Sequence, residues 1–284
     1  DECAKGACNE AVNADACQCE DRAVDNVGDE HHAELFDFGK VEHHGDAQHQ
    51  RAGKGNHHVN QRDKAHSRRD EKIEDEIYGG ENAAFFEQSL ESLYIQTYPA
   101  DEVVLVCDGA LDKELNDVIA VYSEKFGGRL VVNRLESHGG TAKCANTGLA
   151  LCKNEFIMKM DSDDICLDNR AEKQMRYLAE HPDISILGCY IQEFNSGTGE
   201  DIATRCPPVE NDEIRKFARR RAPFNNQTLV YRKSLALSIG GYSEELERCE
   251  DYDFMVRMLM AGAKAANIPE ALVRYRVTPG NLTR

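Results

Sequence analysis

The stretch "EFIMKMDSDD", residues 155–164, decides the fold class, because it is an apolar strand that runs directly into three carboxylates. The run "EVVLVCDG" at 102–109 has the same form and ends in Asp108 and a glycine. Runs of strand character alternate with runs of helical spacing, which predicts a mostly parallel, Rossmann-like α/β sheet with helices on both faces. Ligands bind at the carboxyl ends of strands in such sheets, so both acidic ends are expected at the binding edge.

Two predicted helices flank the strand at 102–109. The first opens on Asn82 as an N-cap and places Phe86, Leu90 and Leu93 on one face. The second covers 113–126 and stops at two glycines. Both helices fit a sheet that is covered by helices.

The composition excludes several classes of protein. A formal net charge of −17 argues against nucleic-acid binding through a basic surface. No stretch approaches the roughly 18 apolar residues of a membrane helix, and no signal peptide is visible. We therefore expect a cytoplasmic protein, with peripheral contact at the inner face of the membrane left open. Seven of the eleven cysteines lie in apolar or helical stretches without paired spacing, and are predicted to be reduced core residues. They are Cys107, Cys144, Cys152, Cys166, Cys189, Cys206 and Cys249.

Residues 1–76 differ from everything that follows. They contain eight of the ten histidines, four cysteines, no proline and few large apolar residues. Such a segment buries too little apolar surface to offset chain entropy, so it is predicted to be disordered. Its His-His pairs leave metal binding as an alternative, although no spacing matches a structural zinc site. The folded domain is then expected at 77–284.

The three acids Asp161, Asp163 and Asp164 lie within four residues. Like charges this close raise one another's pKa values unless a cation is supplied. Mg²⁺ and Mn²⁺ bind carboxylate oxygens and leave positions open for phosphate oxygens, so a metal-diphosphate site is one interpretation. An acidic cap of the following helix, or a solvated face, is the other.

Four blocks in this order resemble those of family 2 glycosyltransferases, in the bacterial branch that builds surface polysaccharides. The blocks are "SLESLYIQTYPADEVVLVCDGALDKEL", "GGTAKCANTGL", "MKMDSDDICLDNRAEKQMRYLAEHPDISILGCYI" and "CEDYDFMVRMLMAGAKAANIPEALVRYR". The resemblance covers about residues 78–276. It implies a GT-A type fold, with a nucleotide half at about 77–164 and an acceptor half at about 165–276. It also implies a nucleotide-sugar donor (UDP-linked), a Mn²⁺ or Mg²⁺ cofactor and transfer with inversion to a glycan or lipid-linked acceptor.

The resemblance also implies roles for four acids. Asp108 corresponds to the acid that contacts the nucleobase or ribose. Asp161 and Asp163 correspond to the metal and diphosphate acids, with Asp163 as the direct ligand. Asp251, in "CEDYD", corresponds to the general base that takes the acceptor's proton. Each acid has a structural alternative: Asp108 could cap the turn at Gly109, and Asp251 could belong to the acidic first turn of a helix.

Three further residues are candidates on weaker grounds. Lys143 resembles a basic position that faces phosphate, with a solvated lysine as the alternative. Glu250 is an acceptor-side candidate. Arg220 lies in the basic run "RKFARRR" (215–221), which could meet an anionic acceptor or a membrane surface, or could be a solvated helix face.

The resemblance fails at the expected first strand. The segment before Tyr78 reads "RRDEKIEDEI", whereas a strand buried between two others is normally rich in Val, Ile and Leu. This predicts that the first strand has been replaced, and leaves open a degenerate copy that binds nucleotide weakly, or a non-enzymatic, metal-binding acidic protein. A sugar-1-phosphate nucleotidyltransferase was a further alternative, but "YGGENAAFF" lacks the basic residue of a phosphate-binding loop.

Overall fold

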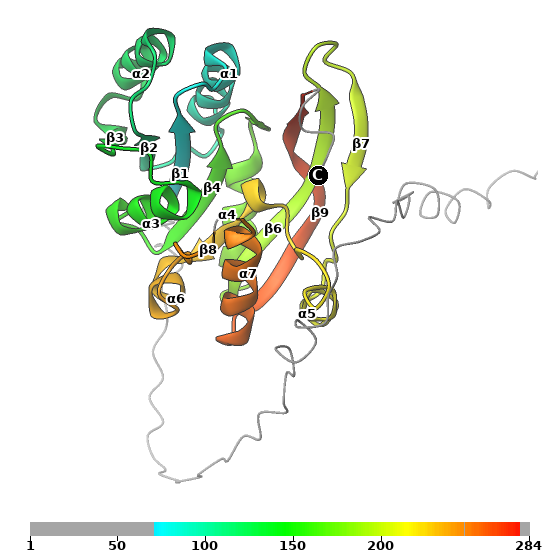
Figure 1. Ribbon diagram of the computed structural model, residues 1–284. Helices are drawn as coiled ribbons and strands as arrows, with labels where there is room; N and C mark the ends of the chain where they lie inside the picture. The colour runs from blue at the N-terminus through cyan, green and yellow to red at the C-terminus, as the bar shows by residue number, and fades with distance from the viewer. Residues whose placement is uncertain (1–70, 247, 279–284) are drawn as a thin grey trace, which may run out of the picture. The chain divides into compact units, whose positions relative to one another are not determined.

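The computed structural model describes residues 71–246 and 248–278, with side chains from Ile77 onward. The strands and helices alternate through the first half of this region (Figure 1). In chain order the elements are β1 (Glu71–Tyr78), α1 (Ala83–Tyr94), β2 (Glu102–Asp108), α2 (Lys113–Phe126), η1 (Gly127–Arg129), β3 (Leu130–Arg134), α3 (Thr141–Leu151), β4 (Phe156–Asp161), β5 (Ile165–Cys166), α4 (Arg170–Glu180), β6 (Ile184–Asn195), β7 (Asp201–Arg205), α5 (Asn211–Phe217), η2 (Asn226–Thr228), β8 (Val230–Arg232), α6 (Lys233–Ser238), α7 (Glu250–Met260) and β9 (Lys264–Val277).

The described strands form one sheet in the order β3-β2-β1-β4-β8-β6-β9-β5, with β7 paired to β6. The strands β3, β2, β1 and β4 are all parallel (Figure 1). β8 is antiparallel to both β4 and β6, while β6 and β9 form a long parallel pair. The predicted fold class is confirmed, and the continuous parallel part of the sheet lies in the half that contains both acidic strand ends.

Helices cover both faces of the sheet, as predicted. Every residue of β2 is buried, and successive side chains join opposite cores. Val103, Leu105 and Cys107 pack with α1 and α2, whereas Val104 and Val106 pack with the core that contains α3 and α7. This alternation is the two-residue period of a strand between two helical layers.

The predicted start of α1 is confirmed. The Asn82 side chain accepts hydrogen bonds from the N–H groups of Ala84 (3.0 Å) and Phe85 (3.2 Å). These bonds satisfy donors that have no acceptor within the helix. The predicted face is buried, with Phe86, Leu90 and Leu93 in the core.

The acid-rich segment before Tyr78 forms the central strand β1. Its backbone pairs with β2 from Lys72 onward and with β4 from Glu71 onward. The strand β1 begins six residues before the predicted domain start at residue 77, and the expectation that this position lacks its strand is wrong for the backbone. The prediction failed because it relied on the polar side chains of this segment. The main-chain hydrogen bonds to the strands on both sides do not depend on apolar side chains. The predicted disorder and metal binding of residues 1–70 lie outside the described residues.

No disulfide joins the seven cysteines in the described part of the chain. Five are buried, as the reduced-core prediction expected. The prediction is wrong for Cys206, which is half-buried, and for Cys249, which is exposed. Cys249 lies directly before α7 rather than within it, at a positive φ of 62°.

Candidate active site

The acidic loop, residues 161–164, connects the carboxyl end of β4 to β5. A backbone hydrogen bond from Asp164 N–H to the Asp161 carbonyl (3.2 Å) closes it into a turn. The Asp161 side chain is about one-third exposed (34%) and lies 3.9 Å from the Lys159 ammonium, which is buried. Asp163 is half-buried, and Asp164 is fully buried. The three predicted acids therefore separate into two at the surface of the loop and one beneath it.

Asp164 is the buried member of the acidic loop. One carboxylate oxygen accepts a hydrogen bond from the Arg276 backbone N–H (2.7 Å), while Oδ2 has no hydrogen-bond partner among the described residues. Burial, together with the charges of Asp161 and Asp163, holds the pKa of Asp164 well above its usual range. Asp164 therefore favours the protonated form more strongly in the folded chain than in the unfolded chain.

Replacing Asp164 with asparagine should stabilise the metal-free protein increasingly as the pH rises. Below its ordinary pKa, Asp164 is protonated in both states and resembles asparagine. As the pH rises towards the raised folded-state pKa, the unfolded chain loses its proton first, so the wild type loses stability that Asp164→Asn retains. Melting in EDTA at a series of pH values measures this, since about 1 kcal/mol moves the midpoint by about 2–4 °C in a domain of this size. Parallel wild-type and variant curves would contradict the expectation.

Arg276 fixes the acidic loop from β9. Its Nε donates to the Asp163 carbonyl (2.6 Å), and its Nη2 donates to the Gln88 side chain on α1 (2.7 Å). The guanidinium lies over the Phe85 ring (4.0 Å) and near the Phe194 ring (4.8 Å). Burial lowers the pKa of Arg276, while its carboxylate neighbours oppose that effect. Arg276 thus connects β9, α1 and the loop.

Asp108 lies at the carboxyl end of β2 with its side chain almost fully buried. Its carboxylate accepts hydrogen bonds from the N–H groups of Gly139 (2.6 Å) and Gly140 (3.0 Å). The Nδ1 atom of His138 lies 2.6 Å from the same carboxylate. Asp108 therefore holds the loop between β3 and α3 against the sheet. This contact differs from the predicted turn cap at Gly109, and the predicted nucleotide contact stays a prediction.

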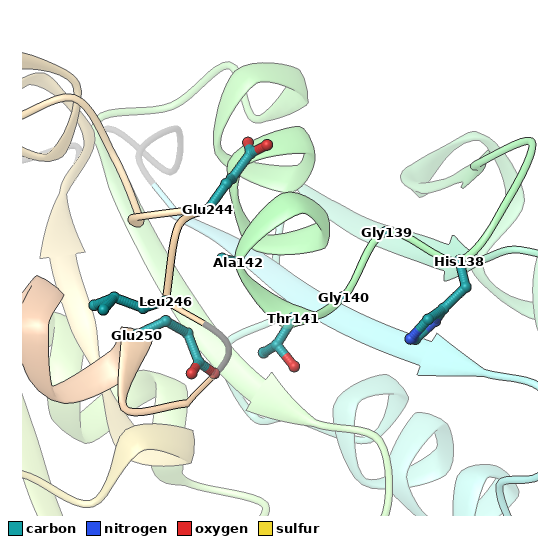
Figure 2. Close-up of a pocket in the computed structure, with 8 residues that line it drawn as sticks. All are labelled: His138, Gly139, Gly140, Thr141, Ala142, Glu244, Leu246 and Glu250. Carbon is teal, nitrogen blue, oxygen red and sulfur yellow. The ribbon is translucent and has the colours of Figure 1, made fainter.

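A cavity of about 340 Å³ lies between the amino ends of α3 and α7. Figure 2 shows the side chains of Thr141 and Glu250 projecting into the same space, with His138 beyond the glycine pair. The lining residues are His138, Gly139, Gly140, Thr141, Ala142, Glu244, Leu246 and Glu250. The cavity is thus formed where the β3–α3 loop held by Asp108 meets the start of α7.

The three acids in the first turn of α7 have different surroundings. Asp253 pairs with Arg257 one turn later (2.6 Å). Asp251 accepts a hydrogen bond from the Tyr252 N–H (2.7 Å) and is half-buried. Glu250 lines the cavity, whereas Asp251 is not among the lining residues. The preceding residue, Cys249, has the left-handed backbone conformation that is uncommon outside glycine and concentrates at functional sites.

Comparison with known proteins identifies the family. The sequence profile of "Glycosyl transferase family 2" matches residues 78–237. The chain belongs to glycosyl transferase family 2. It is 38% identical over 200 residues to the amylovoran biosynthesis glycosyltransferase AmsE of Erwinia amylovora, across 70% of this chain and 73% of that protein.

Two further relatives agree with this assignment. The chain is 30% identical to the Escherichia coli UDP-Gal:alpha-D-GlcNAc-diphosphoundecaprenol beta-1,3-galactosyltransferase, across 70% of this chain and 71% of that protein. Its fold resembles the crystal structure of S. aureus TarS 1-349 in complex with UDP-GlcNAc, with a TM-score of 0.61 and 21% identity. That alignment covers 73% of this chain and 58% of the TarS chain, and it confirms the GT-A fold.

Two of the three weaker candidates in this family 2 glycosyltransferase, Lys143 and Arg220, also lie outside the cavity lining. Lys143 is exposed on α3, with its aliphatic part close to Gly139, where an added Cβ would meet Lys143 Cδ at 2.6 Å. Arg220 is exposed in the turn that follows α5. Their predicted roles towards phosphate and acceptor stay predictions.

The acidic loop fits a hard divalent cation that is shared with a substrate. Over residues 71–246 and 248–278, no three His, Cys, Asp or Glu side chains converge to form a complete protein site. Mg²⁺ is commonly held by one or two carboxylates and completed by water and substrate phosphates. Asp161 and Asp163 at the loop surface match that donor set.

Sequence reasoning missed His138, Asp164 as a buried group, and Arg276. The partners of Arg276 on the acidic loop and α1 are 113 and 188 residues away in sequence. Local patterns carry no information about such contacts. For His138, its place directly before the glycine pair was a usable signal, because that pair opens α3.

Proposed function

We propose that this family 2 glycosyltransferase transfers a sugar from a UDP-sugar to a lipid-linked glycan acceptor in polysaccharide biosynthesis, with inversion at the anomeric carbon. The names of AmsE, which builds amylovoran, and of the E. coli enzyme, which uses UDP-Gal and a diphosphoundecaprenol acceptor, support this assignment. The observation that carries it is the cavity between α3 and α7, at the carboxyl edge where the acidic loop also lies.

The chain's own groups suit a single displacement. The acceptor oxygen forms a bond to the anomeric carbon while the bond to the diphosphate oxygen breaks, and a carboxylate takes the acceptor's proton. We assign this base to Asp251 and the binding of sugar hydroxyls to its cavity-lining neighbour Glu250.

A divalent cation fits the acidic loop in this proposal, with Asp163 as the direct ligand and Asp161 beside it. A bound Mn²⁺ or Mg²⁺ would offset the negative charge of the departing nucleoside diphosphate. Arg276 would keep the backbone of the loop in place for that ion through its bond to the Asp163 carbonyl.

A thermal-shift titration with UDP, GDP and ADP, each with and without Mn²⁺, tests this function. We expect UDP with Mn²⁺ to raise the melting temperature most, since a ligand at 100 times its Kd adds about 2.7 kcal/mol to the free energy of unfolding. Equal shifts with all three nucleotides would contradict the UDP assignment. No shift with any of them would contradict nucleotide binding itself.

The acid-rich first strand left a second hypothesis, that the chain is a degenerate copy. A measurement of turnover distinguishes an active enzyme from such a copy. An active transferase releases UDP from its donor faster when acceptor is present, whereas a degenerate copy binds UDP without this release. The pairing of β1 with both neighbours supports the active enzyme, because the nucleotide half keeps its central strand.

A further inference from the structure

Positive charge is concentrated in the segment from α5 to the end of α6 in the described part of the chain. Residues 214–243 contain seven Arg or Lys and no Asp or Glu, in a chain of net charge −17. Three of them, Arg219, Arg220 and Arg221, are consecutive and exposed, and we call them the basic turn. Backbone bonds from Arg220 N–H (3.0 Å) and Arg221 N–H (3.2 Å) to the Phe217 carbonyl form this turn at the end of α5.

Hydrogen bonds join α5 and the residue before the basic turn to α7. The Arg215 guanidinium donates to the carbonyls of Leu259 (3.0 Å) and Ala263 (2.8 Å) at the carboxyl end of α7, beside α5 (Figure 1). Three residues further along the chain, the Ala218 carbonyl accepts a hydrogen bond from the Tyr252 hydroxyl (2.5 Å), in the first turn of α7. The basic turn therefore begins directly after a residue that is hydrogen-bonded to α7.

The cavity and the basic turn carry opposite charges. Glu244 and Glu250 line the cavity, whereas the basic turn consists of three arginines. Carboxylates suit the hydroxyl groups of a sugar, but they repel a phosphate that has no cation. Arginine pairs with phosphate oxygens through two parallel N–H donors, which makes three adjacent arginines a suitable anion site.

We propose that the basic turn binds the diphosphate group of the lipid-linked acceptor. This proposal rests on the transferase function proposed above. In this proposal the two diphosphates bind at sites of opposite charge. The donor's diphosphate lies at the acidic loop, where a cation is expected. The acceptor's diphosphate lies at the basic turn and needs no cation.

Direct binding tests the proposal independently of turnover. The probe is 11-phenoxyundecyl diphosphate below its micelle concentration, compared with the uncharged 11-phenoxyundecanol, on the full chain. We expect R220Q/R221Q to raise the Kd of the diphosphate about tenfold and to leave the Kd of the alcohol and of UDP with Mn²⁺ unchanged. Arg219 is retained because it makes a further interaction in the structure.

A matched control makes the same change of charge elsewhere. K113Q/K125Q removes two exposed charges from α2, in the nucleotide half, and should leave the diphosphate Kd unchanged. Equal weakening by both double variants would show a general charge effect and overturn the proposal. So would a wild-type protein that binds the diphosphate no better than the alcohol.

A membrane contact is the competing role of the basic turn. If R220Q/R221Q weakens binding to phosphatidylglycerol vesicles but leaves the Kd of the soluble diphosphate unchanged, the turn is a membrane contact and the proposal is wrong. Because binding is read without turnover, failure of the transferase function would appear separately, as probe binding without UDP release.

Discussion

Asp251→Asn should lower kcat about 10²–10⁴-fold while leaving the UDP-dependent thermal shift unchanged. This is the usual contribution of a positioned general base. Asparagine has nearly the shape of aspartate and can still accept the Tyr252 N–H bond, but it cannot take a proton at neutral pH. The measurement is UDP release under saturating donor and acceptor.

Two neighbouring acids serve as matched controls for the base. Asp253→Asn removes a charge that pairs with Arg257 in the same turn of α7, and should leave kcat nearly unchanged. Glu250→Gln changes a residue that lines the cavity, and should raise the KM for substrate more than it lowers kcat. If Glu250→Gln removes turnover and Asp251→Asn does not, Glu250 is the base and our assignment of Asp251 is wrong.

Asp163→Ala should abolish the Mn²⁺-dependent part of donor binding and reduce turnover at least about 10²-fold. Charge stabilisation by a bound cation contributes several kcal/mol, and each 1.36 kcal/mol is a factor of ten in rate. The backbone carbonyl of Asp163, which Arg276 holds, remains in the variant, so the loop should keep its conformation. The UDP titration with and without Mn²⁺ measures the effect on binding.

The control for Asp163→Ala is Asp168→Ala. Asp168 is exposed, four residues after the acidic loop, and its substitution makes the same change of charge. It should leave the Mn²⁺-dependent shift unchanged. If Asp163→Ala keeps the wild-type Mn²⁺-dependent thermal shift, the assignment of Asp163 as a metal ligand is wrong. If both variants lose this shift equally, the loss is a general effect of charge.

The fold was largely predictable because its signals are local. The N-cap at Asn82, the buried face of α1 and the fully apolar run of β2 each follow from a few neighbouring residues. β1 was missed because its register is set by two strands that lie later in the chain, while its own side chains are mostly polar.

The candidate site was predictable only in part. Asp108, Asp161, Asp163 and Glu250 follow strand ends or begin a helix, so alternation and resemblance together place them at one edge of the sheet. The partners of Asp108 and Asp164 depend on how distant loops pack against those ends. The rotation of α7 about its axis decides whether Glu250 or Asp251 faces the cavity. No sequence pattern fixes that rotation.

The Arg276 contact has a consequence for the order in which the protein becomes functional during synthesis. The acidic loop leaves the ribosome more than one hundred residues before the arginine that fixes it. A nascent chain can complete the parallel strands β1–β4 early, but its loop backbone lacks this anchor until β9 has paired with β6. Donor binding should therefore appear late in folding, after the nucleotide half has already formed its core.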